Sequence, residues 1–173
     1  CSERSGGITF EMSIHGIDFF TWLMNGPPVE VVGMGGFHNP LLLPRDTTDH
    51  TGLLVRYANG AMVTYGASLY TSGGYGPEVI SGTTGAVFME GDGMRLLRRD
   101  YRHAPDASLA VDERLPLPKG NGNVAMFRHF GRAMQGLEVP TPDGNAGKVG
   151  VMIARAGEIS YREKRYVRIS ELS

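Results

Sequence analysis

Residues 8–24 restrict the fold of this chain more than any other feature, because they form its most apolar stretch and are too long for one strand. The stretch ends at Asn25-Gly26-Pro27-Pro28. Glycine readily adopts the left-handed conformation that closes a helix, and proline cannot continue one. The pattern therefore predicts a helix of about four turns with Gly26 as its cap. Because the helix is apolar almost all round, we expect it to be buried.

The rest of the chain is dominated by short strand-like segments with glycine-rich turns. Asn59-Gly60 joins two of them and predicts a type I′ hairpin, in which both central residues have positive φ. A second hairpin is expected around Thr83-Thr84-Gly85. The expected strands are residues 29–35, 50–58, 61–71, 77–82, 86–90, 94–99, 109–115 and 165–170.

Two further helices are expected near the C-terminus. One begins after Gly120 and carries an apolar face that includes Phe127 and Phe130, and the other is capped by Asp143 and runs to about residue 162. The order of elements is typical of an α+β fold, an open and predominantly antiparallel sheet with helices on one face. We expect residues 1–173 to form a single domain.

Composition excludes several classes of protein. The 173 residues have a net charge of −1, which gives no field to attract a polyanion, so we expect no nucleic-acid partner. No apolar run approaches the length of a membrane span, so we expect no membrane association. Cys1 is the only cysteine, which excludes an internal disulfide and favours a reducing, cytoplasmic location.

Three ionisable side chains lie on one stripe of the first predicted helix. Glu11, His15 and Asp18 are spaced i, i+4 and i+7. A carboxylate one turn from an imidazole can raise the pKa of the imidazole and fix its tautomer, as a general acid or base requires. The same spacing also suits a structural network in which the three groups pair with one another in the core. Spacing alone leaves both interpretations open.

The segment from Gly6 to Gly26 resembles a signature of the Gfo/Idh/MocA family, the glucose-fructose oxidoreductase and inositol dehydrogenase family. The shared features are Gly6-Gly7, an acidic residue at Glu11, the His-x-x-Asp pair His15 and Asp18, and a helix end with Gly26. Further matches occur in the same order along nearly the whole chain, at Asn59-Gly60-Ala61, at Gly82-Thr-Thr-Gly85, at 130–136, at Asp143-Gly144 and at 167–169.

The resemblance implies roles for particular residues. His15 would contact the reacting hydroxyl as acid or base, and Glu11 would orient the substrate or His15. The family more often has aspartate at the position of Glu11. Asp18 would brace the helix or contact substrate, and Tyr75 matches a position where some members offer an aromatic hydroxyl to a sugar.

The resemblance also implies a partner domain that this chain does not contain. Members pair an N-terminal Rossmann domain, which binds NAD or NADP, with a C-terminal α+β domain whose open sheet often forms an oligomer interface. Gly33-Met34-Gly35-Gly36 follows a predicted strand but does not lead into a helix, so the phosphate-binding turn is missing. We therefore expect the substrate-binding half of a dehydrogenase acting on a sugar, inositol or similar polyol, inactive alone, bound to its own Rossmann domain and self-associated through an exposed sheet face.

Two other functions remain open at this point. His15, Glu11 and His50 could together supply an all-nitrogen-and-oxygen metal site for a hydrolase. Alternatively, the fold could serve as a non-catalytic carbohydrate-binding or assembly module.

Overall fold

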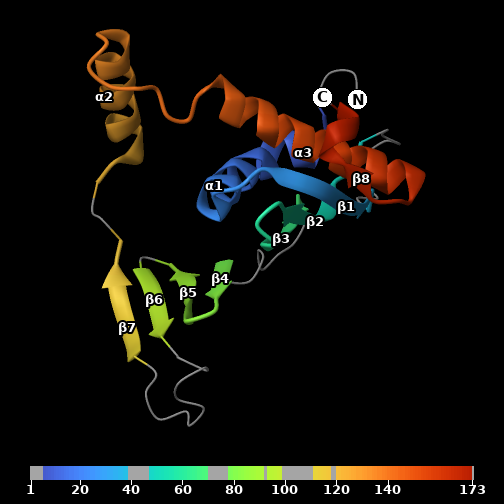
Figure 1. Ribbon diagram of the computed structural model, residues 1–173, viewed down its shortest axis with the longest axis horizontal. Coiled ribbons are helices and arrows are strands. Elements are labelled where there is room, and N and C mark those ends of the chain that lie inside the picture. Colours follow the sequence, from blue (N-terminus) through green and yellow to red (C-terminus); the bar gives the residue numbers. More distant parts are fainter. Residues whose placement is uncertain are drawn as a thin grey trace. The chain divides into compact units, whose positions relative to one another are not determined.

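The computed structural model describes residues 6–38, 47–69, 78–91, 93–98, 111–117 and 120–172 (Figure 1). The chain divides into two compact units. The first comprises residues 1–75 and 140–173, and the second comprises residues 76–139.

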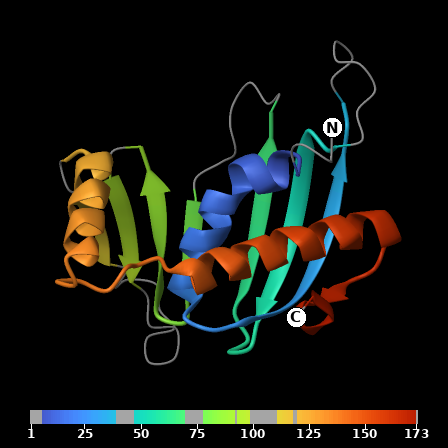
Figure 2. The ribbon, with the colours of Figure 1, turned by 90° about the horizontal axis from the view of Figure 1, so that it is seen from above.

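The first unit is an antiparallel sheet of four strands in the order β3-β2-β1-β8. Helices α1 and α3 lie on the same face of this sheet (Figure 2). Its strands are β1 (Pro28–Gly36), β2 (His50–Tyr57), β3 (Met62–Ser68) and β8 (Val167–Arg168), and its helices are a π-helical turn η1 (Thr9–Ser13), α1 (Ile14–Met24), α3 (Gly144–Glu163) and a final 3₁₀ turn η3 (Ile169–Leu172).

The second unit contains another antiparallel sheet of four strands, joined in sequence order β4-β5-β6-β7. The strands are β4 (Glu78–Gly82), β5 (Gly85–Glu90), β6 (Gly93–Arg98) and β7 (Val111–Pro116), and α2 (Gly122–Met134) follows them. The residues that match the predicted apolar face of α2 are exposed, including Phe127 at 68% and Phe130 at 62%.

The predicted α+β class with antiparallel sheets is confirmed, and each hairpin forms where the turn residues indicated. The described strands form two sheets, whereas the sequence suggested one. Pairing within a hairpin is local and is encoded by the turn, but pairing between hairpins depends on distant contacts that turn residues do not report.

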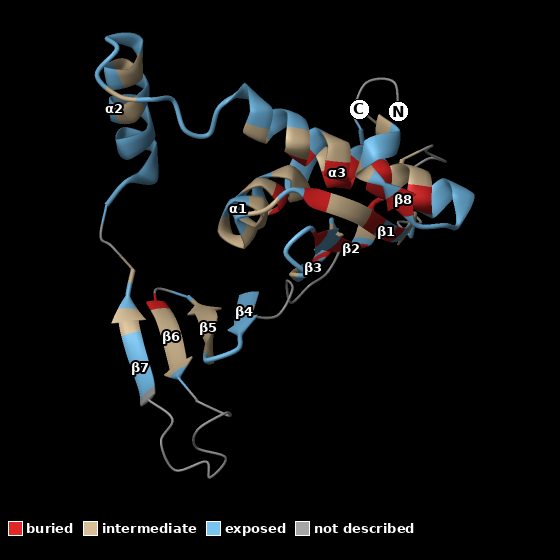
Figure 3. Ribbon diagram, in the orientation of Figure 1, coloured by how far each residue is buried: buried red, intermediate tan, exposed pale blue. Residues whose placement is uncertain are grey.

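The core of the first unit lies between its sheet and the two helices (Figure 3). Every second residue of β2 and β3 points into this core, which produces the alternating burial of both strands. The fully or nearly fully buried hydrophobic residues are Ile17, Val31, Leu53, Val55, Tyr57, Val63, Tyr65, Ile153, Ala154, Ala156 and Val167.

Helix α3 packs against β1 through small residues. A Cβ atom on Gly33 would lie 2.4 Å from the carbonyl oxygen of Gly157, so the backbones of strand and helix are nearly in contact. The buried hydroxyl of Ser160 accepts a hydrogen bond of 2.8 Å from the Gly33 amide and donates to the carbonyl of Arg165. This spacing permits glycine but no larger residue at position 33 without movement of the helix.

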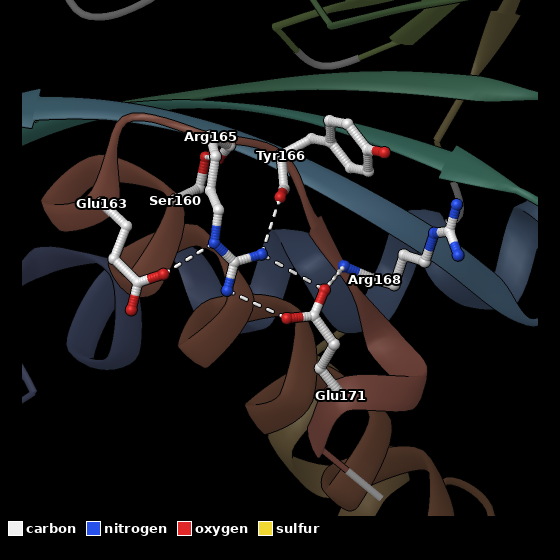
Figure 4. A network of polar contacts seen from close by, with 6 residues as sticks. All are labelled: Ser160, Glu163, Arg165, Tyr166, Arg168 and Glu171. Atoms are coloured by element: carbon white, nitrogen blue, oxygen red, sulfur yellow. Dashed lines mark hydrogen bonds and ion pairs between the residues drawn. The ribbon is translucent and has the colours of Figure 1, made fainter.

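The turn after α3 is held by Arg165 (Figure 4). Its guanidinium contacts the carboxylates of Glu163 at 2.6 Å and Glu171 at 2.9 Å and donates to the carbonyl of Tyr166 at 3.0 Å. The hydrogen bonds to Glu171 and then to Glu163 raise the pKa of Arg165. The contacts are exposed and individually weak, but together they fix the path from α3 through β8 to η3.

Two turn predictions were wrong in detail. The left-handed cap of α1 is Asn25 (φ +48°), not Gly26, and asparagine is the other residue that tolerates this conformation. In the β2–β3 hairpin, Gly60 has φ +86° but Asn59 does not have positive φ. The Tyr57 amide bonds to the Ala61 carbonyl, which makes a three-residue loop instead of a type I′ turn. Asn59 instead donates to the carbonyl of Met24 at 2.7 Å and so helps to end α1.

Candidate functional site

The helical segment that carries the candidate site is held on the sheet by side-chain hydrogen bonds at two points. At its start, Gly7 has φ +76° and its carbonyl accepts the Glu11 amide. The Thr9 hydroxyl, on a residue 6% exposed, donates to that of Thr51 on β2 at 3.2 Å. Two turns further along, Ile17 is fully buried.

The second point is a chain of hydroxyl groups beneath α1. Thr21 bonds to Tyr57 at 2.9 Å, and Tyr57 bonds to Tyr65 at 3.2 Å. Burial raises the pKa of Tyr65, and the hydrogen bond to Tyr57 raises it further, so the Tyr65 hydroxyl stays neutral at physiological pH. These contacts fix which face of α1 points toward the sheet.

Glu11 and His15 lie on the opposite, outward face. Both are exposed and Asp18 is partly buried. Within the described residues, no hydrogen bond or ion pair joins the side chains of these three residues to one another or to the rest of the protein. The structure therefore does not show the buried His–carboxylate network that the spacing also allowed. Two hydrogen-bonding side chains face outward from a rigidly held helix.

Glu11 lies within the π-helical turn η1, which the apolar pattern did not predict. Turns of this kind are rare and are frequent at functional sites. The turn joins α1 directly at Ile14, so it forms the first part of one continuous helical segment.

The expectation that this helix is buried all round was wrong. Met12 is 60% exposed, Phe19 38% and Trp22 68%. They belong to the same outward face as Glu11 and His15, because the contacts of α1 with the core use the other side. Apolar composition alone cannot distinguish a helix buried by its own chain from one that presents apolar groups to a partner.

His50 belongs to a different cluster, at the start of β2. Its Nδ1 atom lies 2.8 Å from a carboxylate oxygen of Asp49, which is 3% exposed, and its ring stacks on His38 with centroids 4.3 Å apart. The backbone amide of His38 donates to both Asp49 oxygens. These contacts tie the ends of β1 and β2 together.

The metal-site hypothesis with His15, Glu11 and His50 gains no support. In the described ranges, no three His, Cys, Asp or Glu side chains gather as metal ligands. Tyr75 lies outside the described residues. No helix in the described part of the chain is long and apolar enough to cross a membrane.

Gly33, Gly35 and Gly36 lie within strand β1, whose edge and face contact β2 and α3. They do not form a turn from a strand into a helix, which is the geometry that binds a dinucleotide pyrophosphate.

Comparison of the sequence with known families gives a match to the GFO/IDH/MocA C-terminal domain over residues 2–88, half of the chain. No curated protein matches the chain.

Several solved structures share the fold. A levoglucosan dehydrogenase in complex with NADH has a TM-score of 0.78 and 19% identity over 94% of this chain and 50% of its own. An oxidoreductase domain protein from Kribbella flavida has a TM-score of 0.76 and 16% identity over 94% and 50%. A candidate myo-inositol dehydrogenase from Sinorhizobium meliloti 1021 has a TM-score of 0.69 and 23% identity over 96% and 51%. The chain thus spans about half the length of these proteins.

Proposed function

Since the chain belongs to the GFO/IDH/MocA C-terminal domain family, we propose that it is the substrate-binding half of an NAD(P)-dependent oxidoreductase. The substrate class is a secondary alcohol of a sugar, inositol or similar polyol. The observation that carries this proposal is the outward-facing, unpaired pair Glu11 and His15 on a helix pinned to the sheet from behind.

Two of the structural neighbours are named for substrates of this class. One is a levoglucosan dehydrogenase seen with NADH and L-sorbose, and another is a candidate myo-inositol dehydrogenase. Levoglucosan and myo-inositol, after which these two proteins are named, are both polyhydroxylated rings. A ring of this kind needs several hydrogen-bonding partners, and exposed side chains without a competing protein partner are able to supply them.

The glycine-rich run Gly33–Gly36 does not fit the cofactor's phosphates, because it lies inside β1 and not at a turn from a strand into a helix. We assign the dinucleotide to an N-terminal Rossmann domain in a longer polypeptide. The nicotinamide supplies the acceptor or donor of hydride. What this chain contributes is control of the hydroxyl proton and of the position of the substrate.

In this proposal His15 accepts the hydroxyl proton as the alcohol becomes a carbonyl, and returns it in the reverse direction. Glu11, one turn earlier, orients the substrate or the imidazole. Asp18, partly buried, braces the helix and contacts substrate where the ring extends toward it. Tyr75 is included as a sugar contact on the family resemblance alone.

The same proposal includes self-association through the uncovered face of the first sheet. Val32, Met34, Leu54 and Met62 are 43–75% exposed there. Among the charged side chains on this face, Glu30 and Arg56 neutralise each other at 2.7 Å, and Arg168 lies opposite Glu30 on β8. We further propose that residues 1–173 act as one domain for substrate binding and oligomerisation, in a cytoplasmic enzyme.

The test uses the full-length enzyme and a panel of sugars, inositols and related polyols. His15→Ala should lower turnover per folded molecule by about 10²–10⁴-fold, the usual contribution of a positioned acid or base. Glu11→Gln should reduce turnover less and shift its pH optimum.

His129→Ala is the matched control, since His129 is also helical but pairs with Glu138 at 2.7 Å in the second unit. Its turnover should be unchanged. A folded His15→Ala enzyme with normal turnover, verified by a thermal melt, contradicts the catalytic assignment.

A further inference from the structure

The π-helical turn η1 has a hydrogen-bond register that its own residues do not favour. Turns of this kind are bonded from residue i to i+5 instead of i to i+4, and they are rare in proteins. The Ser13 hydroxyl, at the end of η1, is buried and has no hydrogen-bond partner among the described residues. A buried hydroxyl without a partner costs free energy, and such groups are uncommon in native structures.

An α-helical register would remove this cost. In an α-helix a serine hydroxyl can bond to the carbonyl three or four residues earlier, which for Ser13 is that of Phe10 or Thr9. The start of η1 offers nothing against this change, because its cap residue Ile8 makes no side-chain hydrogen bond. Contacts from outside the helical segment must therefore hold the π register.

Strand β2 and the residues just before it supply such contacts. The Thr9 hydroxyl donates to the Thr51 hydroxyl at 3.2 Å, and the Ile8 amide lies 3.5 Å from the Thr48 carbonyl. The second distance exceeds the usual range for an amide hydrogen bond, so the bond to Thr51 is the better formed of the two. Because Thr9 is only 6% exposed, removal of the Thr51 hydroxyl would leave a second buried hydroxyl in η1 without its partner.

The register decides where the side chain of Glu11 points. One residue corresponds to about 100° around a helix of 3.6 residues per turn. Conversion of η1 to an α-helix takes up the one extra residue of the π turn, so the start of the segment rotates by about that angle relative to α1. His15 stays in place, because Ile17 and the bond between Thr21 and Tyr57 hold α1 separately.

We propose that Thr51 is a positioning residue of the candidate site: through Thr9 it holds η1 in the π register and keeps Glu11 on the same outward face as His15. This inference rests on the proposed function, in which Glu11 orients the substrate or the imidazole. Thr51 lies 42 residues from Thr9 in sequence and acts on the site from beneath, through the strand that supports η1.

The experiment measures kcat and KM of the full-length enzyme per folded molecule, with the polyol of the panel that gives the highest kcat/KM. Thr51→Val removes the hydroxyl and keeps the shape of the side chain. We expect kcat/KM to fall about tenfold, the loss from one misplaced hydrogen bond to a charged group. The pH optimum should shift in the same direction as in Glu11→Gln. Thr51→Ser keeps the hydroxyl, so this matched control should restore both values.

A double variant separates positioning from a loss of stability. If Thr51 acts through Glu11, Thr51→Val combined with Glu11→Gln should lose no more kcat/KM than the more impaired single variant. Losses that multiply in the double variant, or a Thr51→Val enzyme with the pH profile of the wild type, overturn the proposal. Thr9→Val removes the same hydrogen bond from the other side and should give the same changes, so it replaces Thr51→Val if that variant does not fold.

Crystal structures of the full-length wild type and of Thr51→Val measure the register without turnover. We expect bonds from i to i+5 across residues 9–13 in the wild type and from i to i+4 in the variant, with Glu11 turned away from His15. An unchanged π turn in the variant overturns the proposal. If the register changes in a protein without dehydrogenase activity, the proposed function fails and the control of Glu11 by Thr51 stands.

Discussion

Replacement of Gly33 by alanine tests the close packing of α3 on β1. The added Cβ would meet the Gly157 carbonyl oxygen at 2.4 Å and two further backbone atoms of that residue at 3.0 Å. Backbone atoms cannot rotate away, so the helix must retreat by about 1 Å to restore ordinary contact. The hydrogen bond from the Gly33 amide to Ser160 lengthens with it.

The size of the effect follows from these displacements. Overpacking of this kind costs about 1–3 kcal/mol, and weakening of the buried hydrogen bond adds about 1 kcal/mol. Alanine loses less conformational entropy on folding than glycine, which offsets about 0.5–1 kcal/mol of this lost stability. We expect a net loss of about 1–3.5 kcal/mol, which lowers the melting temperature by about 2–14 °C for a chain of this size.

Thermal melts followed by circular dichroism measure this loss, with Gly147→Ala as the control. Gly147 lies in helix α3, and a Cβ added there would have no atom within 4 Å. Alanine at position 147 should therefore raise the stability of the protein by up to about 1 kcal/mol. The two substitutions therefore have opposite signs. A Gly33→Ala protein that melts with the wild type, beside a normal Gly147→Ala protein, would refute the packing argument.

Two further predictions concern charge and assembly. The amide of Ala146, and then Asn145, hold the pKa of the Asp143 carboxyl below its usual range. The stability this gives is present above the unfolded pKa of about 4 and is lost as the pH falls through the lower folded value. Asp143→Asn keeps an N-cap acceptor without a titrating group, so its melting temperature should fall less on acidification; parallel curves in a pH series would contradict this. In sedimentation velocity at tens of micromolar, the wild type should self-associate and Leu54→Lys should not, and a strictly monomeric wild type would count against the sheet-face interface.

Local signals in the sequence predicted the elements well. Asp143 caps α3 as expected, accepting hydrogen bonds from Asn145 and Ala146. The hairpins form at Asn59-Gly60 and at Thr83-Thr84 because a turn acts over a few residues. The detail of each turn was less predictable. The side chain of Asn59 donates a hydrogen bond to the carbonyl of Met24, which is 35 residues away in sequence. Such a long-range contact leaves no pattern in the local sequence.

The outward face of α1 shows a different limit. Its spacing placed Glu11 and His15 on one stripe, and the structure finds both exposed on one side. Spacing could not show that Phe19 and Trp22 share that side, because a run of apolar residues hides which of them faces the core. The hydroxyl contacts of Thr9 and Thr21 decide this, and neither partner residue is close in sequence.

The contact between Ser160 and Gly33 has a consequence for the behaviour of the chain in concentrated solution. Strand β8 pairs only with Glu30 and Val31, so the outer side of β1 has no strand neighbour beyond that point among the described residues. An uncovered row of amides of this kind can recruit strands from other molecules and start aggregation. Here the amide of Gly33, which lies beyond the paired residues, donates to the Ser160 hydroxyl, and α3 lies against the strand at the same level. The helix thus occupies the position at which another strand would have to bond to Gly33, and so limits the addition of strands to this part of the sheet.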